Sequence, residues 1–324
     1  MTFNERFQLG ERIGSGLCSD VYQAVDLGRN GVVVAVKVTD QDDDVPPHNS
    51  RNELKALLRL RELYGEKTQK ENHIVQLMDS YQYNGQIKFV FEFFKYDLQG
   101  LVFEQSRKKV VFGDRRHSFS RVNRVGVERS TEIVKGIALG LSFIHSAGFI
   151  HRDIKPANIM FKDLESPPVI IDFGISWCEP DNYGKEPEAA KITDIATGRY
   201  KAPELLFSVR RYSSAVDIWA LGIVATLLFS NDCEPIFIPD TDRSDLALLG
   251  SILETFGSPS PEKWPEACES SAFQAMSFIS SEPKPVGELL PKASENDAIL
   301  KVFPKMMVYE SKRRMTALQI YNEL

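Results

Sequence analysis

Residues 151–158 of this 324-residue chain read HRDIKPAN, and Asp-Phe-Gly follows them at residues 172–174. Between the two segments, residues 158–161 and 169–171 are short apolar runs typical of paired strands. Asp and Asn are common in turns, so His-Arg-Asp alone would be a weak signal. The whole pattern at this spacing is far more specific and indicates an active-site loop.

Four polar side chains of these segments fit phosphoryl transfer. Asp153 can accept the proton of an attacking hydroxyl group, and Lys155 can neutralise charge on the moving phosphoryl group. Asn158 and Asp172 offer the hard oxygen ligands that Mg²⁺ prefers. Because phosphoryl transfer requires mainly positioning and electrostatic stabilisation, the pattern predicts an enzyme that transfers phosphoryl groups with the help of Mg²⁺.

The composition argues against several other classes of protein. A formal net charge of −6 disfavours a nucleic-acid-binding protein that works by bulk positive charge. The four cysteines form no CxxC pair and do not cluster with the five histidines, so we expect a reducing compartment and no zinc site. The N-terminus lacks the apolar core of a signal peptide. The longest apolar run, 215–229, contains Asp217 and is short for a bilayer span, so we expect a buried helix and no membrane association.

The segments at 151–158 and 172–174 resemble the catalytic loop and metal-binding motif of the protein-kinase family. The resemblance extends over essentially the whole chain. It implies one domain (1–324) of the α+β class with a bilobal fold, in which a small β-rich N-lobe (1–93) precedes a large, mainly helical C-lobe (94–324). The implied activity is transfer of the γ-phosphate of ATP to serine or threonine.

A glycine-rich turn near the N-terminus interrupts sequence that predicts β structure. It matches the loop with which kinases cover ATP phosphates, except that Ser19 stands at the third glycine position. If that position requires positive φ, serine costs about 1–3 kcal/mol. This is small beside the roughly 8–23 kcal/mol that enzymes supply, so the prediction stands. The ATP contacts expected from this loop are Ile13, Gly14, Gly16 and Val21.

Lys37 follows on a β-branched strand beside Ala35, and both are expected to contact ATP. The strand matches the one that carries the phosphate-binding lysine in kinases. The alternative interpretation is an ordinary exposed lysine on a strand. Its partner should be a glutamate on the following helix, which has an apolar stripe. Glu53 lies in the first turn and is the predicted partner, while the rival Glu62 falls near the far end.

Residues 87–94 are a nearly continuous apolar run that predicts a strand. The resemblance implies that the run ends in the hinge between the lobes, where the backbone from Glu92 to Phe94 binds adenine. It also implies that Phe91 guards the back of the ATP pocket. Asp97 is expected to reach the ribose or the rim of the pocket.

The segment at about 105–129 is strongly basic. Its eight Lys and Arg residues face only two acids, Asp114 and Glu128. We expect an inserted, solvated loop in the C-lobe, with a docking surface for an acidic protein as the alternative. A helix is expected to resume from Thr131 to Ser146.

Residues 172–204 end in Ala-Pro-Glu and resemble a kinase activation segment. Within it, Thr197 is expected to hydrogen-bond Asp153 and Lys155 and to take part in catalysis. This contact would suit a serine/threonine kinase.

One ion pair and one hydrogen-bonded brace are also expected in the C-lobe, both with structural roles. Glu204 needs a buried cationic partner because an unpaired buried carboxylate is costly, and Arg314 is the candidate. Asp217 is expected to brace the backbone of the catalytic loop from the buried helix.

Several stretches narrow the resemblance within the kinases. Residues 250–259 and 263–265 look like the insert of cyclin-dependent-kinase relatives. Residues 46–49 ahead of Glu53, 170–176 and 193–207 are similar to the monomeric activating kinases of cyclin-dependent kinases, of the budding-yeast type. The resemblance implies phosphorylation of the activation-loop threonine of cyclin-dependent kinases, by a monomer without an obligatory cyclin. We expect such an enzyme in the cytoplasm and nucleus.

The position of the usual phosphorylated threonine in the activation segment is occupied by Ile192, one place before Thr193. We therefore predict activity without activation-loop phosphorylation. Arg152 would then pair with another anion, for which Asp194 and Glu188 are the candidates.

Two other functions compete with this prediction. One is a conventional cyclin-dependent or MAP-type kinase, which a cyclin pull-down would reveal. The other is a pseudokinase scaffold, for which Ser19 is the only support. The catalytic set argues against the scaffold because all of its members are present: Lys37, Glu53, Asp153, Asn158 and Asp172.

Overall fold

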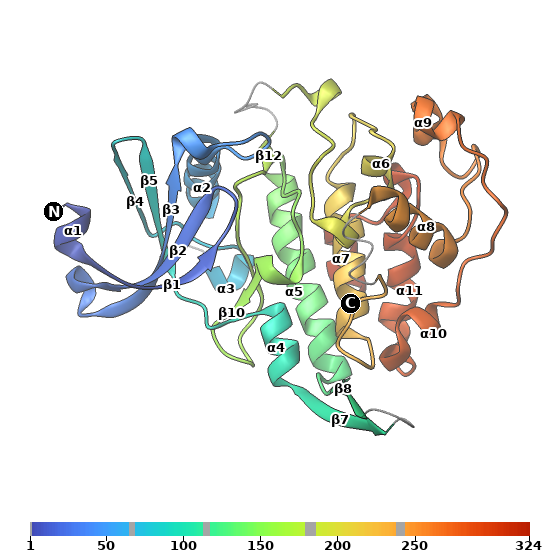
Figure 1. Cartoon of the computed structure of the whole chain (residues 1–324), viewed down its shortest axis with the longest axis horizontal. Helices are drawn as coiled ribbons and strands as arrows, with labels where there is room; N and C mark the ends of the chain where they lie inside the picture. The colour runs from blue at the N-terminus through green and yellow to red at the C-terminus, as the bar shows by residue number, and fades with distance from the viewer. Residues whose placement is uncertain (1, 65–68, 113–116, 179–185, 238–243) are drawn as a thin grey trace.

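The computed structural model describes residues 2–64, 69–112, 117–178, 186–237 and 244–324, arranged in two lobes (Figure 1). The N-lobe contains a five-stranded antiparallel sheet with the order β1-β2-β3-β5-β4. The C-lobe is mainly helical. The α+β class and the bilobal arrangement predicted from the sequence are therefore confirmed.

The central strand of the N-lobe sheet is β3. Successive side chains of a strand point to opposite faces. Val34 and Val36 pack in the small core of the sheet, whereas Ala35 and Lys37 face the cavity between the lobes. The N-lobe elements are α1 (Phe3–Arg6), β1 (Phe7–Ser15), β2 (Ser19–Asp26), β3 (Val32–Asp40), α2 (Ser50–Tyr64), α3 (Gln69–Asn72), β4 (Asp79–Tyr83) and β5 (Gln86–Glu92).

Helix α2 belongs to the core of the C-lobe as much as to its own lobe. Its buried Leu54, Leu57 and Leu60 share one apolar cluster with residues of the C-lobe helices. The helix begins where Asn49 Oδ1 accepts the N–H of Asn52 at 2.9 Å, a side-chain cap of the kind that stabilises helix N-termini. This packing places the first turn of α2 beside β3.

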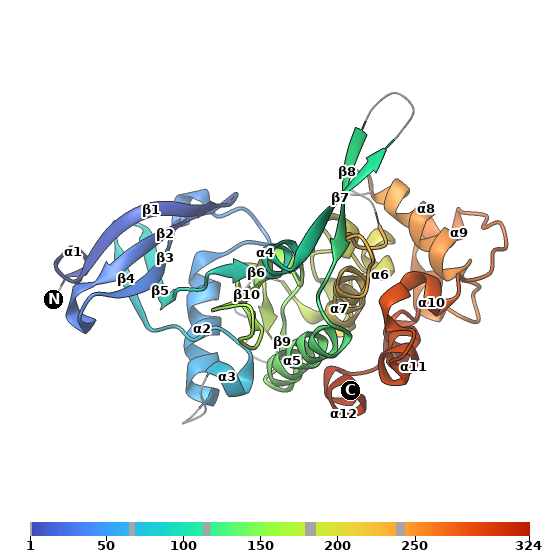
Figure 2. The same cartoon turned by 90° about the horizontal axis from the view of Figure 1, so that it is seen from below.

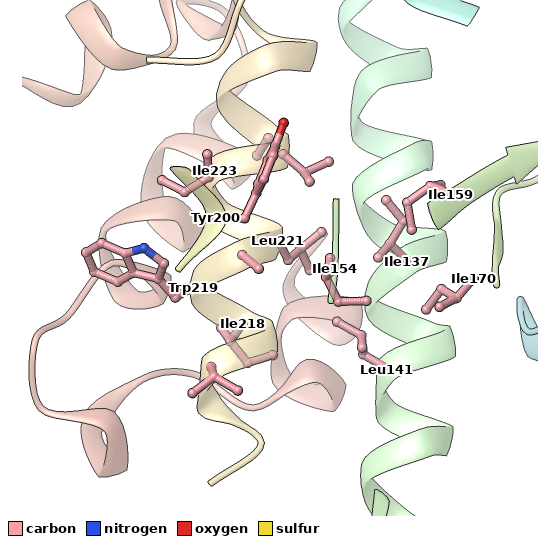
Figure 3. Packing of buried hydrophobic residues seen from close by; sticks show 14 of the residues in the cluster. Ile137, Leu141, Ile154, Ile159, Ile170, Tyr200, Ile218, Trp219, Leu221 and Ile223 are labelled. Atoms are coloured by element: carbon pink, nitrogen blue, oxygen red, sulfur yellow. The ribbon is translucent and has the colours of Figure 1, made fainter. Parts of the chain in front are cut away.

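Two long helices, α5 and α7, form the centre of the C-lobe. In Figure 3, Ile137 and Leu141 of α5 point toward Ile154 in the catalytic loop. Every residue of α7 is buried, which confirms the buried helix expected at 215–229. The C-lobe helices are α4 (Leu98–Glu104), α5 (Val127–Ser146), α6 (Pro203–Leu206), α7 (Ala215–Leu228), α8 (Asp245–Phe256), α9 (Ser271–Gln274), α10 (Val286–Leu289), α11 (Asp297–Met306) and α12 (Ala317–Glu323).

Short strands hold the catalytic segments in the C-lobe. Strands β10 and β11 pair antiparallel, with Ile159 opposite Ile170, as the two apolar runs predicted. Among the described residues, no helix is long and apolar enough to cross a membrane. The short strands are β6 (Tyr96–Asp97), β9 (Phe149–Ile150), β10 (Ile159–Phe161), β11 (Val169–Ile170) and β12 (Trp177–Cys178).

The basic segment is a β-hairpin rather than the expected loop. Strands β7 (Ser106–Phe112) and β8 (His117–Asn123) pair antiparallel and project from the C-lobe (Figure 2). The cross-strand pair of Val110 and Phe119 favours a hairpin, because β-branched and aromatic partners stabilise strand pairing. Helix α5 begins at Val127, four residues before the expected start. Asp114, Arg115 and Arg116 lie outside the described residues.

Candidate active site

A cavity of about 390 Å³ lies between the sheet of the N-lobe and the C-lobe. Its walls include all but one of the predicted ATP contacts, namely Ile13, Gly14, Gly16, Val21, Ala35, Lys37, Glu53, Phe91, Glu92 and Phe94. Sequence reasoning missed an apolar part of the lining that belongs to no motif, which comprises Leu57, Val75, Met160 and Ile171. Together these residues make a largely apolar slot with a polar end, which suits a nucleotide.

Asp97 is the predicted contact that the structure places elsewhere. Its carboxylate accepts the N–H of Gly100 at 2.6 Å and caps α4. It is not among the residues that line the cavity. The capping bond uses Oδ1 of the carboxylate, and the contact of Asp97 with the ribose stays a prediction.

Ser19 carries no backbone strain. It lies at the start of β2, opposite Thr39, and is not among the described residues with positive φ. The cost of about 1–3 kcal/mol considered for a non-glycine residue at positive φ therefore does not arise. Ser19 also lines the cavity.

Lys37 stands between two carboxylates at the polar end of the cavity. Its Nζ lies 2.6 Å from Glu53 Oε1 and 2.8 Å from Asp172 Oδ1. The Lys37–Glu53 pair predicted from the sequence is present, and Glu62 plays no part in it. Lys37 and Glu53 are 8% and 1% exposed, so this ion pair is shielded from water.

Burial and charge act in opposite directions on these groups. Burial alone would lower the pKa of Lys37, but the carboxylates of Asp172 and Glu53 outweigh it and raise that pKa. Burial would likewise raise the pKa of Asp172, yet Lys37 holds it well below its usual range. Burial raises the pKa of Glu53 more than Lys37 lowers it. Near neutral pH, Lys37 is thus a cation and Asp172 an anion.

The catalytic loop is held from behind by Asp217 of α7. Its Oδ2 accepts the N–H of His151 at 2.9 Å, and its Oδ1 accepts the N–H of Arg152 at 2.8 Å. Arg152 has a φ of 73°, which is costly for a residue with a side chain and needs such support. Burial would raise the pKa of Asp217, but a hydrogen bond with His145 and the loop amides lower it. The predicted brace is therefore present.

Asp153 is surrounded by three polar groups. Thr197 Oγ1 donates to its Oδ1 at 2.8 Å, and Asn158 Nδ2 lies 3.0 Å from its Oδ2. Lys155 Nζ lies 2.8 Å from the same Oδ2 and 2.8 Å from Thr197 Oγ1. These contacts fix the carboxylate beside Lys155 and Asn158, which line the cavity, and a hydroxyl group held there could give its proton to Asp153.

Asn158 and Asp172 are oriented to hold a divalent cation. The Nδ2 of Asn158 also donates to the carbonyl of Asp153 at 2.8 Å, which turns the amide nitrogen away and leaves its oxygen as the ligand atom. Asp172 is ionised and lines the same cavity as Asn158. Carboxylate and amide oxygens are the ligand types that suit Mg²⁺, which takes its remaining ligands from phosphate and water. Among the described residues, no group of three or more His, Cys, Asp or Glu side chains is arranged so that it could hold a metal ion.

The anion that pairs with Arg152 is Glu186. Two parallel hydrogen bonds of 3.0 and 2.8 Å join the guanidinium to both oxygens of this carboxylate. The candidates proposed from the sequence, Asp194 and Glu188, were wrong: Glu188 is exposed, and Asp194 lies 3.3 Å from Lys201 instead. The Nε1 of Trp177 donates to the backbone carbonyl of Glu186 and helps to fix this turn.

The activation segment ends in the second buried ion pair. Glu204 lies 2.6 Å from Arg314, and the side chains of both residues have no exposed surface. The pair predicted from the sequence is therefore present. It anchors α6, which follows the Thr197 contact with Asp153 by a few residues.

Comparison with known proteins agrees with this geometry. Residues 7–324 match the protein kinase domain family. Serine/threonine-protein kinase CAK1 of Saccharomyces cerevisiae is 34% identical over 74% of this chain and 73% of its own length. Cyclin-dependent kinase D-1 of Oryza sativa is 30% identical over 97% of this chain and 65% of its own length, and cyclin-dependent kinase 20 of Danio rerio is 26% identical over 97% and 81%. Since a cavity, a catalytic aspartate and a whole-length family match coincide, the chain belongs to the protein kinase family, as a serine/threonine kinase related to the cyclin-dependent kinases.

Proposed function

We propose that this kinase transfers the γ-phosphate of ATP to the activation-loop threonine of cyclin-dependent kinases, and that it acts as a monomer without a cyclin. One observation carries the proposal: residues of this chain itself form both the Lys37–Glu53 pair and the pair between Arg152 and the carboxylate of Glu186. Neither contact needs a partner chain or a phosphate group. The similarity to CAK1 and to the activating kinases of the budding-yeast type supports the choice of substrate.

The transfer follows from the positions of the polar groups. Asp153 accepts the proton of the threonine hydroxyl, whose oxygen forms a bond to the γ-phosphorus as the bond to the β–γ bridging oxygen breaks and ADP leaves. Lys155 stabilises charge on the moving group, and Lys37 holds the other phosphates. Asn158 and Asp172 would hold Mg²⁺, which neutralises charge on the phosphate oxygens.

The test is phosphate transfer from labelled ATP by the purified chain alone. The acceptor is a catalytically dead cyclin-dependent kinase without cyclin, with its activation-loop threonine or with alanine in that place. We expect label only on the threonine form. Activity on generic substrates, with no label on this acceptor, would leave a kinase with a different substrate. Cyclin capture in a pull-down would instead favour the conventional cyclin-dependent kinase.

Substitution of Glu186 tests whether this carboxylate supports activity in place of a phosphate group on the activation segment. Glu186→Ala is expected to lower kcat/KM about 10- to 100-fold, because hydrogen bonds to a charged group contribute roughly 1.5–3 kcal/mol and Arg152 would be left buried without an anion. Peptide phosphorylation kinetics measure the effect. Glu188→Ala removes the same charge from an exposed position and is expected to change little. Two results would contradict activity without activation-loop phosphorylation. One is an equal loss of kcat/KM in Glu186→Ala and Glu188→Ala, and the other is a complete loss of activity in a folded Thr193→Ala variant.

We also propose that the enzyme works in the cytoplasm and nucleus. None of the four cysteines is in a disulfide bond, and three of them are buried. Chains without disulfides are typical of reducing compartments. Localisation of a fluorescent fusion in living cells tests this directly, and a secreted fusion would contradict it.

A further inference from the structure

The first turn of α2 is tied to the Asp-Phe-Gly motif by a closed circuit of hydrogen bonds. Asn49 N–H donates to the carbonyl of Gly174 at 3.1 Å, and the carbonyl of Asn49 accepts the N–H of Glu53 at 2.9 Å. Glu53 binds Lys37, and Lys37 binds Asp172 Oδ1, which also accepts the N–H of Gly174 at 3.3 Å. The contact between Asn49 and Gly174 therefore connects the two segments that carry the carboxylates around Lys37.

A second set of contacts fixes the loop that precedes α2. The carboxylate of Asp44 accepts the Ser50 N–H at 3.0 Å and the Ser50 hydroxyl at 2.9 Å. His48 Nδ1 lies 3.0 Å from Asp44 Oδ1. The side chains of Asp44 and His48 are only 13% and 15% exposed, so water competes little for these bonds.

The ring of His48 lies directly against Gly174. A Cβ atom built on Gly174 would lie 2.8 Å from His48 Cδ2 and 2.9 Å from His48 Nε2, closer than real Cβ atoms come to other groups. The ring therefore fills the space that the glycine leaves open. This packing, together with the bond to Asp44, sets the direction in which the N–H of Asn49 points.

We propose that residues 44–50 form an internal brace, in which Asp44 and His48 are positioning residues that hold the first turn of α2 on Gly174 and so keep Glu53 on Lys37. Neither side chain lines the nucleotide cavity, so both act through Asn49 and Glu53. The brace holds α2 in this position through contacts within the chain. Without it, a bound subunit would be needed to hold the helix there. Only this last consequence rests on the proposed function, because the brace itself concerns kinase activity toward any acceptor.

The test measures kcat and the KM for ATP of the full chain with casein as a generic acceptor. Asp44→Ala and His48→Ala are each expected to lower kcat about tenfold, because loss of one charge-assisted contact shifts the population of the assembled state by about that factor. The KM for ATP is expected to change less than about threefold, because the apolar cavity walls are intact. Hydrogen exchange at the amides of 50–53 and of Gly174 should rise together.

Two variants serve as controls. Asp43→Ala removes the same charge from the exposed neighbouring residue and is expected to keep full kcat. Asp44→Asn keeps an oxygen for the Ser50 N–H and is expected to recover part of the activity. Equal kcat in Asp44→Ala and Asp43→Ala would overturn the brace, and so would a uniform rise in exchange over α5 and α7, which indicates general destabilisation. If the variants show the expected differences in kcat with casein but the enzyme places no label on a cyclin-dependent kinase, only the proposed substrate is overturned.

Discussion

Asp153→Asn is expected to lower the rate of phosphate transfer about 10²- to 10⁴-fold, the usual contribution of a positioned general base. The substitution keeps the size of the side chain and its hydrogen bond from Thr197 Oγ1, which is 2.8 Å long in the structure. An amide cannot take the proton of the attacking hydroxyl group. The substitution also removes the negative charge that attracts Lys155, whose Nζ lies 2.8 Å from the carboxylate. The loss should therefore fall on the chemical step and not on the fold.

Single-turnover transfer from labelled ATP measures this step, and calorimetry measures ATP binding separately. We expect a large fall in the single-turnover rate and a small change in the affinity for ATP. Asp297→Asn makes the same chemical change at an exposed position in the first turn of α11 and should leave both unchanged. If Asp153→Asn transferred phosphate at more than about a tenth of the normal rate, proton acceptance by Asp153 would not be part of the mechanism.

Glu204→Ala is expected to lower the free energy of unfolding by about 3–5 kcal/mol, because it leaves a buried charge without its partner. The guanidinium of Arg314 donates to both oxygens of Glu204 at 2.6 and 2.7 Å. It also donates to three backbone carbonyls, so the whole group is held inside the C-lobe. Activity should fall as well, since α6 holds the end of the activation segment.

Equilibrium unfolding in urea measures this loss. Glu323→Ala is a matched control, since it breaks an exposed pair with Lys305 and should cost no more than about 1 kcal/mol. The double variant Glu204→Gln/Arg314→Met leaves no unpaired charge and should cost less than the sum of its single variants. A loss below about 1 kcal/mol for Glu204→Ala would mean that water reaches the site and solvates Arg314.

The kinase fold and most of the candidate site could be predicted from the amino-acid sequence. HRDIKPAN and Asp-Phe-Gly identify the catalytic loop because its chemistry depends on residues close together in the chain. Lys37 and Glu53 could be paired because the strand of Lys37 resembles that of the phosphate-binding lysine in kinases, and Glu53 stands in the first turn of the helix that follows. The pair of Glu204 and Arg314 could be named because a buried carboxylate requires a cation.

The tertiary structure decided which of several equivalent groups meet. The sequence left Asp194 and Glu188 as candidates to neutralise Arg152, and only the path of the activation segment brings Glu186 to it instead. Asp97 caps α4 instead of lining the cavity, because the helix begins immediately after it. The apolar lining and the packing of His48 on Gly174 carry no motif in the sequence. These contacts join segments far apart in the chain, so their partners are set by packing and burial of the folded molecule and not by local pattern.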